Sequence, residues 1–165
     1  MQLLIPWDEA SLPLMLTVVK SRMRQVSLRF LAPYGITPQQ YQVLRVLSER
    51  PGLCHGGLAG ALGLDKPSAT RLLQSVERKG WVELFPHPAN KRKLRLELSP
   101  EGLRMVDRLE AFRKTMREGL EEGLEEGERK AIRAILHKLH NNLDRMEAVA
   151  GTAPEDDVRN PLCGS

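Results

Sequence analysis

The sequence predicts a mainly α-helical protein with one small β-hairpin, and two observations carry that prediction. Over most of the 165 residues, apolar side chains recur every three or four positions, the spacing of a helix with one buried face. Over residues 81–98 the spacing changes to every second residue, which is the pattern of strands. The elements follow in chain order.

Residues 9–32 predict a first helix, because apolar residues alternate in steps of four and three. They are Leu12, Leu16, Val19, Met23, Val26 and Phe30. Pro33, Tyr34 and Gly35 then break the helix. Thr37 to Gln40 has the pattern of a capping box, and the second helix begins there and stops before Pro51.

A short third helix holds Leu58, Ala59 and Leu62, and Gly63 closes it. The fourth helix begins at Asp65, whose carboxylate can accept the first amide hydrogens, and it ends at Gly80. Its inward positions have helical spacing and are Ala69, Leu72, Leu73 and Val76.

Residues 81–85 and 93–98 predict two strands, and the polar, basic residues 87–92 between them predict the exposed loop of a hairpin. Ser99 and Pro100 then open a long helix. Each of Gly119, Gly123 and Gly127 costs about 1 kcal/mol relative to alanine, so we expect this helix to break there. A last helix carries Ile132, Ile135, Leu136, Leu139, Leu143 and Met146 on one face.

The net charge of +4 hides a strong asymmetry. Residues 1–65 carry +2, residues 66–95 carry +6 and residues 96–165 carry −4. A central basic block of this kind is what contact with a polyanion requires, although a solvated surface is an equally good explanation of charge alone.

The third and fourth helices, joined by a few residues around Gly63, predict a helix-turn-helix, in which the second helix enters the major groove of DNA. Opposite its apolar stripe the fourth helix carries donors that suit base edges and phosphates, with no acid in the two turns after Asp65. An ordinary solvated face would mix Glu with Lys. The predicted contacts are Lys66, Pro67, Ser68, Thr70, Arg71, Gln74 and Arg78.

The hairpin strengthens this interpretation, because a basic ribbon can follow phosphates and place an arginine in the minor groove. A solubilising loop is the alternative. The predicted hairpin contacts are His87, Asn90, Lys91, Arg92, Lys93 and Arg95. Aromatic residues make up 4% of the chain, which suits a protein that reads duplex grooves without stacking on bases.

Five stretches carry a family resemblance, and the most specific is residues 65–81, DKPSATRLLQSVERKGW. With residues 37–44 and 58–64, and with 90–93 and 96–102, the chain resembles the multiple-antibiotic-resistance regulator (MarR) family over residues 10–148. The family's wing usually reads Asp-Arg-Arg, whereas this chain has Asn90, Lys91 and Arg92, so Arg92 is expected to be held less firmly.

The resemblance implies a winged helix-turn-helix lobe at residues 33–99 and a helical dimerisation region at residues 1–32 and 100–150, with residues 151–165 read as a disordered tail. It implies a homodimer that reads a pseudo-palindromic operator. The first and last helices carry more apolar surface than so small a lobe can cover, which agrees with a dimer.

Members of the family respond to small molecules, to thiol oxidation or to metal. The resemblance places an aromatic or lipophilic effector between the first, second and long helices, although such residues are more often plain core. They are Met15, Met23, Tyr34, Tyr41, Phe112 and Met116. Cys54, just before the third helix, is the candidate thiol, since amide dipoles there could lower its pKa.

His137 and His140 are three residues apart on the last helix, but zinc needs three or four ligands, so we expect no metal site and no cofactor. The sequence has no phosphate-binding loop, no nucleophile beside a base and no membrane-length apolar stretch. We therefore expect a cytoplasmic regulator of transcription that binds double-stranded DNA and is not an enzyme. The alternatives are a redox-responsive regulator that uses Cys54 and a non-specific, nucleoid-type DNA-binding protein.

Overall fold

The computed structural model describes residues 6–87 and 90–150, and the chain divides into two compact units, residues 1–118 and 119–165. The structure is mostly helical with one three-stranded antiparallel sheet, which confirms the predicted fold class. The predicted disordered tail at residues 151–165 lies outside the described residues. Within the described residues no helix combines the length and apolar character that crossing a membrane needs.

The first helix, α1, spans Leu12–Leu31. Its predicted apolar stripe is exposed to solvent in the single chain, whereas Leu31 at its end is fully buried. A 3₁₀ turn, η1, at Ala32–Tyr34 follows, and Gly35 adopts the left-handed conformation (φ 62°) that ends it. The predicted break at residues 33–35 is confirmed.

The second helix, α2, spans Pro38–Glu49 and begins with the predicted capping box. The Gln40 amide donates to Thr37 Oγ1 at 3.2 Å, and the Thr37 amide donates to Gln40 Oε1 at 3.1 Å. The helix then buries Val43, Leu44 and Leu47, so its start and its inward face are both fixed.

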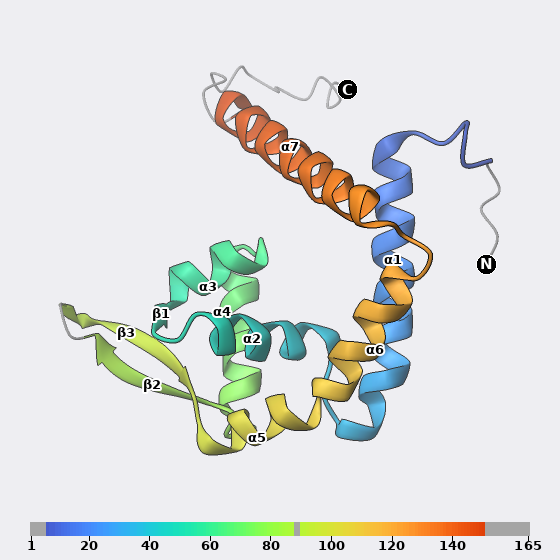
Figure 1. The fold of residues 1–165 in the computed structure, drawn as a ribbon. Helices are drawn as coiled ribbons and strands as arrows, with labels where there is room; N and C mark the ends of the chain where they lie inside the picture. Colours follow the sequence, from blue (N-terminus) through green and yellow to red (C-terminus); the bar gives the residue numbers. More distant parts are fainter. Residues whose placement is uncertain (1–5, 88–89, 151–165) are drawn as a thin grey trace, which may run out of the picture. The chain divides into compact units, whose positions relative to one another are not determined.

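The helix-turn-helix consists of α3 at His55–Leu62 and α4 at Lys66–Glu77 (Figure 1). Gly63, at φ 60°, closes α3, as expected for a glycine after a helix. Both helices pack on α2, and their buried residues belong to one hydrophobic core. The core comprises Leu31, Ile36, Val43, Leu44, Leu47, Leu58, Leu73, Val76, Trp81, Val82, Leu96, Met105, Leu109 and Phe112.

The hairpin strands are longer than predicted, with β2 at Val82–His87 and β3 at Asn90–Leu98. The predicted six-residue loop at 87–92 is therefore wrong, because His87 pairs with Asn90 and only residues 88–89 separate the strands. Polar residues in a solvent-exposed hairpin interrupt the apolar alternation of the sequence, but the backbone hydrogen bonds between the two strands continue through them.

A third strand, β1 at Leu53–Cys54, was not predicted. It pairs with β3 in the order β1-β3-β2, and Leu53 lies opposite Leu96. Two residues are too few to show a period of two, so only the tertiary structure reveals this strand.

The predicted long helix is two helices, α5 at Pro100–Arg108 and α6 at Glu110–Glu121. Leu109 separates them, with φ −92° and ψ 2°, and its amide hydrogen is shared between the carbonyls of Met105 and Val106. Neither glycine nor proline marks this position, so the break could not be predicted from the sequence.

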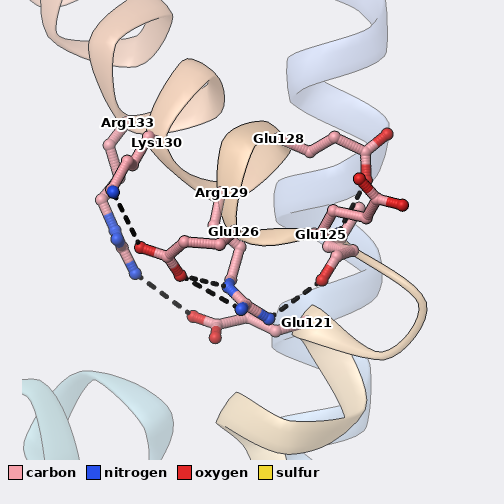
Figure 2. A network of polar contacts seen from close by, with 8 residues as sticks. Glu121, Glu125, Glu126, Glu128, Arg129, Lys130 and Arg133 are labelled. Atoms are coloured by element: carbon pink, nitrogen blue, oxygen red, sulfur yellow. Dashed lines mark hydrogen bonds and ion pairs between the residues drawn. The ribbon is translucent and has the colours of Figure 1, made fainter.

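The second unit contains the turn after α6 and the last helix, α7, at Glu126–Ala150. The predicted break among the three glycines is confirmed, since Gly123 is left-handed at φ 76°. Arg129 holds the turn: it donates to the Leu124 carbonyl at 2.9 Å and to Glu126 at 3.1 Å (Figure 2). Arg133 reaches Glu121 at 3.7 Å, so one ion pair joins the end of α6 to α7.

Candidate nucleic-acid interface

The predicted DNA-contacting residues of α4 lie on the opposite side of the helix from its buried face. Ala69, Leu73 and Val76 are buried in the core, and Leu72 packs against it. The predicted contacts Lys66, Pro67, Thr70, Arg71, Gln74 and Arg78 are exposed, and Ser68 is half-buried. Between Lys66 and Val76 the helix therefore presents a polar face with two cations, Lys66 and Arg71, and no carboxylate. The exposed Glu77 ends the helix and Arg78 follows it.

Asp65 begins α4 as predicted. Its Oδ1 accepts the Ser68 amide at 2.7 Å and its Oδ2 accepts the Ser68 hydroxyl at 3.1 Å. These two hydrogen bonds hold the pKa of Asp65 below its usual value, because they stabilise the charged carboxylate. The cap fixes where the helix starts, and therefore which side chains it presents.

The Ser68 hydroxyl also orients Arg71. The Arg71 Nη2 donates to Ser68 Oγ at 3.3 Å, so a chain of hydrogen bonds runs from Asp65 through Ser68 to the guanidinium. The guanidinium keeps its other donors for a ligand, and it is the group that suits a guanine edge or a phosphate.

A buried glutamine joins α4 to α2, a contact that was not predicted from the sequence. Gln40 is 7% exposed and donates from Nε2 to Ser75 Oγ at 3.2 Å. The Ser75 hydroxyl in turn donates to the Leu72 carbonyl at 2.7 Å. The helix that carries the predicted contacts is thus held by polar as well as apolar packing.

His55, the first residue of α3, touches the predicted contact face directly. Its Nε2 lies 3.1 Å from Thr70 Oγ1, and the Thr70 hydroxyl also donates to the Lys66 carbonyl at 2.8 Å. No sequence pattern singled out His55, because it is 15 residues from Thr70 and belongs to another helix.

The hairpin carries the other predicted contacts. The backbones of His87 and of Asn90, Lys91, Arg92 and Lys93 belong to β2 and β3, but their side chains lie outside what the structure describes. Their part in DNA binding stays a prediction.

Two further cations of the basic block, Arg95 and Lys79, also have partners within the chain. Arg95 lies 3.0 Å from Glu97 and 5.6 Å from the centre of the Phe85 ring. Lys79 donates to the Gly35 carbonyl and lies 4.6 Å from the Trp81 ring. Arg95 is therefore a weaker candidate for phosphate contact than its charge suggests, since a ligand would compete with Glu97.

A cavity of about 470 Å³ opens between the start of α3, α4 and the hairpin. Its lining is mostly apolar and consists of Cys54, His55, Gly56, Leu73, Leu84, Leu94 and Leu96. Cys54 is half-buried at the position that caps α3, as predicted.

The predicted effector residues are only partly brought together. Tyr41 meets Phe112 edge to face at 5.0 Å, and Phe30 lies 6.1 Å from Phe112. Burial raises the pKa of Tyr41 above its usual value. Tyr34 and Met116 pack against the same core, whereas Met15 and Met23 do not belong to it.

A histidine of α7 lies near a carboxylate of the same helix: His140 Nε2 is 3.7 Å from Asp144 Oδ2, a pair that the sequence did not predict. Among residues 6–87 and 90–150, no three His, Cys, Asp or Glu side chains are grouped so as to hold a metal ion.

Known proteins share sequence and fold with this chain. The model of the MarR family matches residues 36–94. The chain is 33% identical over 73 residues to the multiple antibiotic resistance protein MarR of Salmonella typhimurium, covering 44% of this chain and 51% of that protein. It is 29% identical over 97 residues to the homoprotocatechuate degradative operon repressor of Escherichia coli, covering 56% of this chain and 66% of that protein.

The chain thus spans about half to two thirds of the length of these relatives. Among solved structures, the MepR–DNA complex of Staphylococcus aureus superposes with a TM-score of 0.75 at 23% identity, over 81% of this chain and 96% of that one. At that identity the superposition establishes the fold.

A helix-turn-helix followed by a strand hairpin defines the winged helix fold. Within that class of proteins, residues 36–94 of this chain are similar to the domain of the MarR family.

Proposed function

We propose that this protein is a sequence-specific transcriptional repressor that binds double-stranded DNA in the cytoplasm, as a homodimer on a pseudo-palindromic operator. The exposed face of α4 carries the proposal, because two cations and several neutral donors lie there with no carboxylate before Glu77. A similar protein is an operon repressor and a similar structure is a DNA complex, and both support the same conclusion.

The proposal is tested by fluorescence anisotropy with the DNA upstream of the protein's own gene and with a scrambled duplex. The upstream DNA should bind roughly a thousandfold more tightly or better, and affinity should fall steeply as salt rises. Equal affinity for both duplexes would favour the alternative, a non-specific nucleoid-type protein.

Two variants separate the contacts that read bases from those that hold phosphates. Arg71→Ala or Gln74→Ala should cost about 1–3 kcal/mol and relax the sequence preference. Lys91→Ala should instead weaken binding to both duplexes alike and lower the salt dependence by about one counterion. Lys138→Ala, on α7, is the matched control and should change neither.

The homodimer part of the proposal rests on apolar faces that the single chain leaves exposed. Seven large apolar residues of α1 from Leu12 to Phe30, and six of α7 from Ile132 to Val149, are at least 36% exposed. A monomer rarely leaves so much apolar surface in contact with water, so a second copy of the chain is the natural partner.

We also propose that a small aromatic or lipophilic molecule weakens DNA binding by entering near Tyr41 and Phe112. The edge-to-face contact of these rings supports it, since an aromatic ligand can replace one ring against the other. Phe112 is 5% exposed, so entry requires it to move. An apolar fluorescent dye should bind the wild type, and Phe112→Leu should change its affinity; equal affinity would contradict the site.

The redox alternative is favoured by one observation, the half-buried position of Cys54 at the cap of α3. Peroxide should then release DNA from the wild type and not from Cys54→Ser. Release from both proteins, or from neither, would remove Cys54 as a sensor.

A further inference from the structure

The Thr70 hydroxyl has two neighbours and one hydrogen. Its Oγ1 lies 2.8 Å from the Lys66 carbonyl oxygen and 3.1 Å from His55 Nε2. A carbonyl oxygen can only accept, so an oxygen–oxygen separation of 2.8 Å requires the hydroxyl hydrogen to lie between Thr70 and Lys66.

That assignment decides the state of His55. Since the Thr70 hydrogen points to Lys66, the contact with Nε2 is a hydrogen bond only if Nε2 carries the hydrogen and donates it. His55 therefore holds Thr70 from one side while the backbone of α4 holds it from the other.

The consequence concerns what Thr70 can offer to DNA. An isolated threonine both donates and accepts, and so suits any base. Here the hydrogen and one lone pair are already used, which leaves one acceptor lone pair and a methyl group on an exposed side chain. An acceptor matches the exocyclic amino groups of adenine and cytosine, and it is repelled by the acceptor edges of guanine and thymine.

We propose that His55 is a specificity-determining residue that acts through Thr70: the Lys66 carbonyl holds the hydroxyl hydrogen and the His55 N–H holds the oxygen in place, so that the base facing Thr70 meets a fixed acceptor and is read as adenine or cytosine. The inference rests on the proposed DNA binding and deepens it. His55 is a positioning residue in this scheme, because Thr70 makes the base contact.

The first test is spectroscopic and needs no DNA. Nitrogen-15 NMR of the imidazole rings, at a mildly alkaline pH where free histidine is neutral, reports which ring nitrogen carries hydrogen. The chain has four histidines, and the His55 signals are those that His55→Gln removes. Hydrogen on Nε2 is expected, and hydrogen on Nδ1 would overturn the proposal.

The second test selects DNA from a randomised duplex library with the wild type and four variants. Thr70→Val keeps the shape of the side chain and removes the hydroxyl. The preference for one base at one base-pair position of each half-site should therefore fall by about fivefold or more. His55→Phe should weaken the preference at that same base-pair position, since the Thr70 oxygen is then held only by its bond to the Lys66 carbonyl. His55→Gln retains an N–H and should retain the preference.

His137→Phe makes the same substitution on α7 and should leave the base preference at every position unchanged. Far-ultraviolet circular dichroism checks that each variant is folded. If the wild type selects a sequence but His55→Phe selects the same one equally strongly, the role of His55 is wrong and the proposed function stands. If the wild type selects no sequence, the proposed function fails and the role of His55 fails with it.

Discussion

Asp65 shows how a single carboxylate determines what a whole helix presents. It caps α4 by accepting two hydrogen bonds from Ser68, and Ser68 in turn orients Arg71. Removing the carboxylate would leave the first amides of α4 to water and free the guanidinium to move.

We expect Asp65→Ala to lower the midpoint of thermal unfolding by a few degrees, because a lost N-cap destabilises the helix that it starts. Differential scanning calorimetry measures the change. Asp107→Ala, an exposed aspartate in α5, should leave the midpoint nearly unchanged. Equal midpoints for the two variants would contradict the capping role.

The same cap predicts a pH dependence. The folded protein holds the pKa of Asp65 below its unfolded value, so the stabilisation is fully present above that unfolded value, near 4. It is lost as the pH falls through the lower pKa of the folded state. The gap in stability between wild type and Asp65→Asn should therefore narrow below about pH 4.

At the scale of elements, two glycines in neighbouring helices have opposite roles. A β-carbon on Gly102, near the start of α5, would lie 2.0 Å from the Trp81 carbonyl oxygen, a distance that only backbone movement can relieve. A β-carbon on Gly119 in α6 meets nothing within 4 Å. The first glycine is there for close packing, whereas the second only weakens its helix.

Gly102→Ala should therefore reduce the free energy of unfolding by about 1–3 kcal/mol, as overpacking does. Gly119→Ala should raise it by about 1 kcal/mol, because alanine is the better helix former. Urea denaturation of the two variants measures both, and changes of the same sign would show that the packing of α5 against Trp81 has been misread.

The sequence was informative wherever a local rule operates. The capping box at Thr37, the cap at Asp65, the glycine after α3 and the break near Gly123 all follow from short-range chemistry, and the structure has each of them. Strand β1 and the break at Leu109 depend on tertiary packing, which leaves no local signature.

In the candidate interface, too, local features could be predicted from the sequence and tertiary contacts could not. The exposed face of α4 follows from helical periodicity, so its residues could be named from the sequence. The contacts of His55 with Thr70 and of Gln40 with Ser75 join residues 15 and 35 positions apart, and no sequence period connects such pairs.

For the whole molecule, the apolar faces of α1 and α7 make a prediction about assembly. Leu136 is 48% exposed and Leu143 is 62% exposed, so a charge at either site is harmless to a monomer and costly in an apolar interface. Leu136→Glu and Leu143→Glu should shift the protein from dimer to monomer in analytical ultracentrifugation. Arg145→Glu also reverses charge on α7 and is the control; a monomeric wild type would refute the proposed assembly.

Gln40 has a mechanical consequence for the DNA-binding unit. Its amide oxygen completes the cap of α2 while its amide nitrogen holds Ser75 of α4, so the side chain has one permitted orientation. The Gln40 amide therefore couples the start of α2 to the last turn of α4, in addition to the apolar core that they share. Unwinding of the first turn of α2, next to the linker from α1, would break this coupling and loosen the helix that carries the proposed DNA contacts.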